Sequence, residues 1–187
     1  MPMHSPAGTS PLGIRRATPA DAAALATFAE TAFVDTFAAD NMPEDMAAYL
    51  AEAFGEPQQR EELMDPSRIV LVAERDGELA GYAMLNDGAA PTGPVSASLT
   101  NAIEIARLYS GRRWIGTGVG AALMQNCFDV AASRGREWIW LGVWERNARA
   151  IAFYSRWGFT DVGSQSFQLG ADLQTDRIMA RRIAARE

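Results

Sequence analysis

Apolar residues recur along this chain with two periods, close to two in some segments and close to 3.6 in others. Segments with the alternation or β-rich content of strands are residues 13–17, 69–74, 78–85, 103–109, 138–144, 159–169 and 175–181. Segments with helical spacing are residues 18–33, a stretch from 43 to about 54, and residues 58–64, 118–133 and 148–157. Strands and helices interleave, so the pattern predicts an α/β fold.

Local signals mark several boundaries of these elements. Thr18 followed by Pro19 is typical of a helix start, an N-cap with proline at the first helical position. Asp76-Gly77 is a dipeptide favoured in tight hairpins and predicts that the second and third strands pair. Residues 87–100 are rich in Pro, Gly, Ser and Ala, which predicts a mobile loop.

The run 114–124, W-I-G-T-G-V-G-A-A-L-M, lies between the fourth strand and a helix. Gly116, Gly118 and Gly120 let the backbone approach an anion closely, and a helix N-terminus offers unpaired N–H groups. A phosphate or pyrophosphate is the natural ligand of such a cradle, and a plain glycine-rich helix cap is the alternative. The chain has no lysine, which excludes a Walker loop, and the spacing does not fit G-x-G-x-x-G.

A second block, N-A-R-A-I-A-F-Y-S-R-W-G-F at 147–159, follows about thirty residues later. With both blocks in this order, the sequence resembles the GCN5-related N-acetyltransferase (GNAT) family over residues 13–183. Ile115 departs from the family pattern, which has Arg or Gln there. The resemblance implies a mixed central sheet of six to seven strands flanked by helices, with acetyl-CoA bound at a splay between strands four and five. It also implies one domain, residues 13–187, after a flexible leader, residues 1–12.

Three further segments resemble the bacterial Pai-type polyamine acetyltransferases. They are F-V-D-T-F-A-A-D-N-M-P-E-D-M-A-A-Y-L at 33–50, W-L-G-V-W-E-R-N at 140–147 and S-F-Q-L-G-A-D-L-Q-T-D-R-I-M-A at 166–180. None of these segments forms the glycine loop. The resemblance implies a polyamine such as spermidine as the amine acceptor.

Composition narrows the classes of function. A length of 187 residues with 48% hydrophobic residues suits one domain with a sizeable core. The net charge of −6 disfavours nucleic-acid and anionic-membrane partners. We find no apolar stretch near the ~20 residues of a membrane span and no signal-peptide pattern at the N-terminus.

Cysteine and histidine are nearly absent. The single cysteine, Cys127, excludes an internal disulfide and favours a cytoplasmic location. The single histidine, His4, lies in the leader, so we expect no metal site and no catalysis by a Ser-His or Cys-His pair.

The family resemblance assigns acetyl-CoA to particular backbone groups and one side chain. Asn147 would cap the helix after strand five, and the resemblance adds a hydrogen bond to the cofactor. The pantetheine arm would meet backbone groups that the splay leaves unpaired, and the pyrophosphate would meet the N–H groups of the glycine loop. These residues are Leu108, Tyr109, Gly116, Thr117, Gly118, Val119, Gly120 and Ala121.

Two residues are candidates for proton transfer. Tyr154 matches the tyrosine that in the family commonly protonates the departing thiolate, and packing in the core is the alternative. Glu104 on the fourth strand matches a glutamate that acts as a base directly or through water in several family members. A solvent-facing glutamate is the alternative, and a water chain could deprotonate the ammonium without it.

Acidic residues are concentrated in one part of the chain. Residues 17–66 hold eleven acidic side chains against one basic side chain, Arg60. In the family, this region borders the acceptor entrance, where negative potential would attract a cationic amine. We therefore expect Asp35 and Glu44 of this region, together with Asp176 from the last strand pair, to bind the substrate. Solubilisation of exposed helices is the alternative explanation.

Other functions stay open at this stage. The acceptor could be a peptide or protein N-terminus instead of a small amine. The chain could be a catalytically silent acyl-CoA sensor or a nucleotide-binding α/β protein. It could act as a monomer or as a homodimer.

Overall fold

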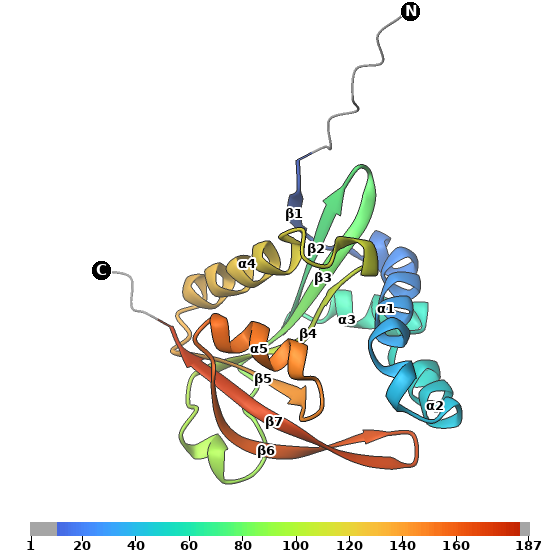
Figure 1. Ribbon diagram of the computed structural model, residues 1–187. Coiled ribbons are helices and arrows are strands. Elements are labelled where there is room, and N and C mark those ends of the chain that lie inside the picture. The colour runs from blue at the N-terminus through green and yellow to red at the C-terminus, as the bar shows by residue number, and fades with distance from the viewer. Residues whose placement is uncertain (1–10, 184–187) are drawn as a thin grey trace, which may run out of the picture.

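The computed structural model describes residues 11–183, which form one twisted sheet with helices on both faces (Figure 1). The strands of this part of the chain are β1 (Gly13–Arg16), β2 (Arg68–Arg75), β3 (Glu78–Asp87), β4 (Ala102–Ser110), β5 (Trp138–Trp144), β6 (Thr160–Leu169) and β7 (Asp172–Arg182). Their order in the sheet is β1-β2-β3-β4-β5-β7-β6. Only the β4–β5 pair is parallel. The predicted α/β fold with a mixed sheet of six to seven strands is confirmed.

The helices divide between the two faces of the sheet. They are α1 (Ala22–Phe37), α2 (Pro43–Ala53), α3 (Glu56–Met64), α4 (Val119–Ser133) and α5 (Ala148–Arg156). One buried cluster joins α4 and α5 to the sheet through residues such as Leu123, Met124 and Tyr154. A second cluster joins α1 and α2 to the opposite face through Leu25 and Met46. Successive buried side chains along β2 and β3 belong alternately to the two clusters, because neighbouring residues of a strand face opposite sides of the sheet.

The β4 and β5 strands separate at the centre of the sheet. Their pairing covers only Ala102–Trp138, Ile103–Ile139 and Glu104–Trp140, although both strands continue beyond these pairs. Strand β4 also has an extra residue, Ala106, between the pairs Met84–Arg107 and Leu85–Ile105. A bulge of this kind bends the strand. The result is the predicted splay, with β4 turning away from β5 (Figure 1).

Close packing fixes the start of α4 beside the end of β4. A Cβ placed on Gly81 of β3 would lie 2.7 Å from the carbonyl oxygen of Tyr109 and 2.8 Å from Cγ1 of Val119. Only glycine permits this approach of helix to sheet. The glycine loop is therefore held at the open end of the splay.

Some boundaries differ from the sequence prediction. Helix α1 continues to Phe37 rather than ending near residue 33, and the Phe33 and Phe37 rings pack with centroids 4.6 Å apart. Together with its flanking turns it forms a 22-residue helical segment, Pro19–Asp40, long and apolar enough to cross a membrane by length and composition. The segment also carries Asp21, Glu30, Asp35 and Asp40, so it is not an uninterrupted apolar stretch. Its Leu25, Ala29 and Phe33 are buried in the core, which accounts for the apolar character of this face. The predicted leader lies outside the described residues except for its last two positions.

Candidate functional site

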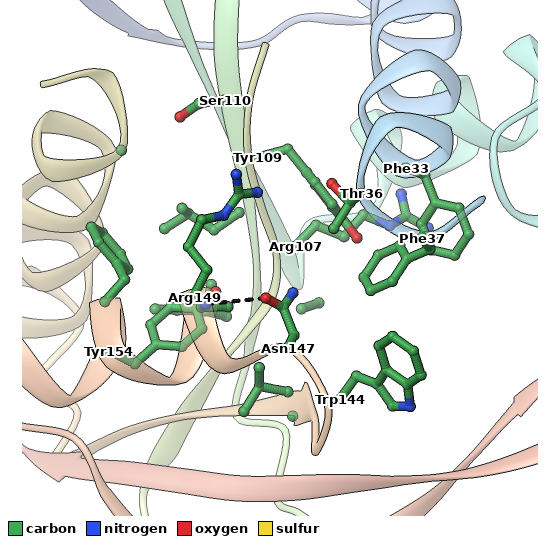
Figure 2. A pocket seen from close by; sticks show the side chains of 18 of the residues that line it. Phe33, Thr36, Phe37, Arg107, Tyr109, Ser110, Trp144, Asn147, Arg149 and Tyr154 are labelled. Atoms are coloured by element: carbon green, nitrogen blue, oxygen red, sulfur yellow. Dashed lines mark hydrogen bonds between the residues drawn. The ribbon is translucent and has the colours of Figure 1, made fainter. Parts of the chain in front are cut away.

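A pocket of about 530 Å³ opens where β4 and β5 separate. The glycine loop and the first turn of α4 border it on one side, and α5 forms part of its floor. Aromatic residues of α1 and β5 border it on the side away from α4, as the labelled Phe33, Phe37 and Trp144 show (Figure 2). The pocket therefore joins a polar backbone cradle to an aromatic compartment.

The glycine loop presents backbone N–H groups to this pocket. Gly116 and Gly118 have φ of 80° and 93°, and a Cβ on either would meet no atom within 4 Å. Gly118 is the N-cap of α4, and the first hydrogen bond of the helix runs from the Ala122 N–H to the Gly118 carbonyl oxygen. The N–H groups of Val119, Gly120 and Ala121 are thus left without helical acceptors, as at any helix start.

Thr117 serves the loop itself. Its backbone N–H and its Oγ1 both donate to the carbonyl oxygen of Trp114, at 3.2 Å and 2.8 Å. Thr117 is outside the residues that line the pocket, and so is the buried side chain of Val119. The structure uses these two residues to shape the loop and to anchor α4, while Gly116, Gly118, Gly120 and Ala121 line the pocket.

Three arginines that were not predicted from the sequence also line the pocket, Arg107, Arg149 and Arg156. Arg149 and Arg156 lie on α5, and Arg149 extends across the pocket towards Ser110 at the end of β4 (Figure 2). No hydrogen bond or ion pair engages the Arg149 guanidinium within residues 11–183. Arg149 is the third residue of the block that begins at Asn147, where helical spacing could have indicated its face. A cation beside a helix N-terminus strengthens an anion site.

Asn147 caps α5 as predicted. Its side-chain oxygen accepts a hydrogen bond from the Ala150 N–H at 3.1 Å, drawn as a dashed line in Figure 2. The side chain also lines the pocket. Its amide N–H groups have no protein acceptor in the described part of the chain, so they are available to a bound molecule.

Leu108 and Tyr109 line the pocket beyond the last β4–β5 pair. Here β4 pairs only with β3, through Leu108–Ala83 and Tyr109–Tyr82. The strand edge that faces β5 is therefore open to a ligand bearing amide groups. The Tyr109 ring stacks on Tyr82 with centroids 5.7 Å apart, which fixes the end of the strand.

Tyr154 lies on α5 with its ring against Phe153 and Phe159 and 9% of its surface exposed. It lines the pocket, so it is both a core residue and a site residue. Burial, with a smaller contribution from nearby Cys127, raises the pKa of its hydroxyl. The phenol therefore stays protonated at neutral pH and can donate a proton.

Glu104 is not among the residues that line the pocket. It pairs with Trp140 at the last position where β4 and β5 are joined, and its Oε2 accepts a hydrogen bond from Asn86 Nδ2 at 2.8 Å. Burial raises the pKa of Glu104, and the Asn86 hydrogen bond opposes part of this rise. Strand alternation correctly predicts a face different from that of Ile103, but the carboxylate stops short of the cavity.

Of the three acidic residues expected at the acceptor site, the structure brings only Asp176 to the pocket. Asp35 on α1 and Glu44 on α2 are exposed and lie outside its lining. Asp176 forms no hydrogen bond or ion pair within residues 11–183. Because burial removes much of its hydration, the pKa of Asp176 rises from 3.8 to about 6.

The aromatic compartment is the largest feature that sequence analysis missed. Its rings come from α1, from α2 and the residue that follows it, from β5 and from β6, and all of them line the pocket: Phe33, Phe37, Tyr49, Phe54, Trp144 and Phe167. Arg107 lies among them with its guanidinium 4.9 Å from the centroid of the Phe54 ring. Helical spacing of aromatics looks the same for a closed core and for a cavity wall, so the sequence held no separate signal.

The described residues contain no cluster of side chains suited to bind a metal ion. Within residues 11–183, no group of three or more His, Cys, Asp or Glu side chains could hold a metal ion. The single histidine, His4, lies outside this range.

The chain is similar to known acetyltransferases. The sequence model described as the Acetyltransferase (GNAT) family matches residues 32–159. An uncharacterized N-acetyltransferase encoded in the pepI 3′ region of Lactobacillus delbrueckii subsp. lactis is 37% identical over 155 residues, which cover 81% of this chain and 86% of the relative. An uncharacterized N-acetyltransferase of Mycobacterium tuberculosis is 36% identical over 141 residues, covering 75% and 84%.

A solved structure shares the same fold. The PaiA N-acetyltransferase from Thermoplasma acidophilum, in complex with coenzyme A, superposes with a TM-score of 0.77 at 20% identity. The match covers 92% of this chain and 99% of that one. At this identity the likeness concerns the fold and leaves the acceptor open.

Proposed function

The chain belongs to the GNAT acetyltransferase family and is an acetyl-CoA-dependent N-acetyltransferase, and we propose that its acceptor is the primary amine of a small cationic molecule. One observation carries the proposal. Asp176, which has no hydrogen-bond or ion-pair partner within residues 11–183, lies in the wall of the pocket that the glycine loop borders at its other end. An ammonium group is the natural partner for such a carboxylate.

The residues present fit acetyl-CoA. The open N–H groups at the start of α4 and the space in front of Gly116 and Gly118 suit a pyrophosphate. We assign Arg149 to the same phosphates, since it lines the pocket, extends across it (Figure 2) and has no partner for its guanidinium within residues 11–183. The open edge of β4 at Leu108 and Tyr109 would hold the amide-bearing arm, with Asn147 donating from α5.

Acetyl-CoA, when bound, supplies the thioester acetyl group. Tyr154 holds a proton on its Oη at neutral pH and is assigned to donate it to the departing sulfur. Glu104 lies at the vertex of the splay outside the pocket lining, so we assign it the removal of the ammonium proton through intervening water. These roles are supported by the place of Tyr154 in the pocket lining and of Glu104 at the last β4–β5 pair.

A cytoplasmic reaction is proposed with the same function, on the basis of the single buried thiol, Cys127. The polyamine acceptor expected from the Pai-type segments receives support from Asp176 but not from Asp35 or Glu44, which lie outside the pocket lining. The pocket supports the cationic amine more strongly than it supports a particular polyamine.

An acceptor panel tests the proposal. Purified protein with acetyl-CoA is offered monoamines, polyamines and peptides, and released thiol is measured together with the mass of the product. We expect free amines to gain one acetyl group in step with the released thiol. Acetylation of peptides alone, with every free amine inert at millimolar concentration, would replace the small-amine acceptor by a peptide N-terminus.

A further inference from the structure

The aromatic compartment is built from rings that touch one another across the splay. Phe33 packs against Phe37 and Tyr49 with centroids 4.6 Å and 4.9 Å apart. Phe37 meets Trp144 from β5 at 6.0 Å, and Tyr49 meets Phe167 from β6 at 5.4 Å. Phe33, Phe54 and Trp144 are buried, Phe37, Tyr49 and Phe167 are half-buried, and together the six rings form one wall of a cavity of about 530 Å³. The wall offers a bound molecule a large apolar surface.

The compartment has one free negative charge. Asp176 is the only carboxylate among the pocket-lining residues of the described chain. It pairs in the sheet with Trp144, and its charge adds to the rise that burial causes in the pKa of Tyr49. The carboxylate therefore lies beside the aromatic wall, within reach of a molecule that contacts both.

The positive charge in the compartment is already balanced within the protein. Arg107 forms a bidentate pair with Glu62, with Nη1–Oε2 and Nη2–Oε1 distances of 2.7 Å and 3.1 Å. Glu62 is 3% exposed and also binds Arg68. This pair therefore contributes no spare negative charge that could hold a second cation.

Ring faces could in principle hold further ammonium groups by cation–π contact. Two of the rings already have protein cations over them, Arg107 at 4.9 Å from the Phe54 centroid and Arg146 at 5.8 Å from the Trp144 centroid. Besides Asp176, the polar side chains that line this part of the pocket are Thr36, Tyr49, Arg107 and Gln174, and none of them carries a negative charge. The second and third ammonium groups of a polyamine would therefore lack a charged partner there, which is unfavourable for a buried charge.

We propose that the aromatic compartment binds the acceptor and selects an amine that has a single positive charge and is attached to an aromatic or bulky apolar group. The nitrogen lies at Asp176 and the apolar group packs against Phe37, Tyr49 and Trp144. This inference rests on the proposed function and names the substrate class of the same site. It differs from the polyamine expectation, which needs several anionic partners.

Specificity constants for three probe amines test the inference. They are 2-phenylethylamine, n-propylamine and spermidine, each assayed at saturating acetyl-CoA by thiol release and by the mass of the product. We expect kcat/KM for 2-phenylethylamine to exceed that for n-propylamine by about 10- to 100-fold, the gain from burying a phenyl ring. We expect it to exceed that for spermidine by about 10-fold or more, since each uncompensated charge is costly in the compartment.

A matched pair of variants locates the effect. Phe37→Leu removes a ring from the aromatic wall and should lower the phenylethylamine-to-propylamine ratio about 3- to 10-fold. Phe128→Leu makes the same change on α4, outside the pocket lining, and should keep the ratio of the unaltered protein. The affinity for 2-phenylethylamine, measured by calorimetry in the absence of turnover, should fall in Phe37→Leu and stay unchanged in Phe128→Leu.

The outcomes separate the inference from the proposed function. Spermidine as the preferred substrate, or equal ratios in Phe37→Leu and Phe128→Leu, would overturn the inference while leaving a small cationic amine as acceptor. Acetylation of peptides with all three amines inert would overturn both. Preference for 2-phenylethylamine that is lost in Phe37→Leu supports both.

Discussion

Replacing Asp176 by asparagine separates what this carboxylate does for binding from what it costs the fold. The change removes the charge and keeps the size of the side chain. In the free protein the ionised carboxylate is poorly hydrated and has no partner in the described chain, and the pKa of Asp176 rises from 3.8 to about 6 for this reason. We therefore expect Asp176→Asn to stabilise the unliganded fold while it weakens amine binding.

The size of the stability effect follows from the pKa shift. A rise of about two units corresponds to at most about 3 kcal/mol in the free energy of unfolding. Asp176 is half-buried, so water at the pocket reduces this to about 1 kcal/mol. That is a rise in Tm of roughly 2–4 °C for a domain of this size.

The pH dependence has a definite sign. A carboxyl whose pKa is raised in the fold costs stability once it ionises, so the contribution of Asp176 to the unfolding free energy falls as pH rises from about 4 to 6. Asp176→Asn should match the unaltered protein in stability at pH 4 and exceed it at pH 7. The other charged groups that line the pocket are Arg107, Arg149 and Arg156, and burial raises the pKa of Tyr49, which stays neutral.

Amine binding should move in the opposite direction. Losing a hydrogen bond between charged groups costs about 1.5–3 kcal/mol, so KM for the amine should rise roughly 10- to 100-fold. The dissociation constant for acetyl-CoA, measured by calorimetry, should stay unchanged. Thermal unfolding at pH 4 and pH 7 completes the test. Asp129→Asn, on the exposed face of α4, is the control and should show neither effect. An Asp176→Asn protein that is less stable at pH 7, or that keeps its KM, would refute the reasoning.

Three further predictions concern the cofactor end of the pocket. Gly118→Ala should weaken acetyl-CoA binding about 10-fold or more, because it disturbs the backbone N–H groups of the loop. Gly135→Ala, at a glycine that also has positive φ and open space, should lower only the stability of the fold. Equal acetyl-CoA affinities of the two variants in calorimetry would contradict the loop assignment. Tyr154→Phe should lower kcat by about 10²- to 10⁴-fold with little change in acetyl-CoA affinity, and full activity would leave Tyr154 as a packing residue. Arg149→Ala should raise the dissociation constant for CoA about 10-fold and reduce its salt dependence, and an unchanged constant in a salt titration would remove Arg149 from the phosphate site.

The sequence predicted best those features that depend on local backbone. The glycines at 116–120, the cap at Asn147 and the Asp76-Gly77 hairpin are all specified within a few residues, and the structure confirms the turns and the cap. The splay was implied only by the family resemblance. It depends on where two strands stop pairing, which no local pattern encodes.

Side-chain positions relative to the cavity were harder to predict. Alternation gives the face of Glu104 but not its place at the last β4–β5 pair, below the pocket. The count of acidic residues in 17–66 gives the charge of the region but not which side chains face the pocket. Asp35 and Glu44 both lie outside the pocket lining. Phe33 and Phe37 lie on an apolar helix face whose spacing fits a closed core equally well. That they line a cavity depends on the packing of α1 against β5, which the sequence pattern does not encode.

A crystal structure of the protein with CoA and a bound amine tests the account most directly. The account predicts pyrophosphate oxygens within about 2.7–3.2 Å of the N–H groups of Gly118, Gly120 and Ala121. It also predicts the sulfur within hydrogen-bond reach of the Tyr154 hydroxyl and the amine nitrogen at the Asp176 carboxylate. A CoA molecule bound away from the glycine loop, or an amine bound remote from Asp176, would contradict it.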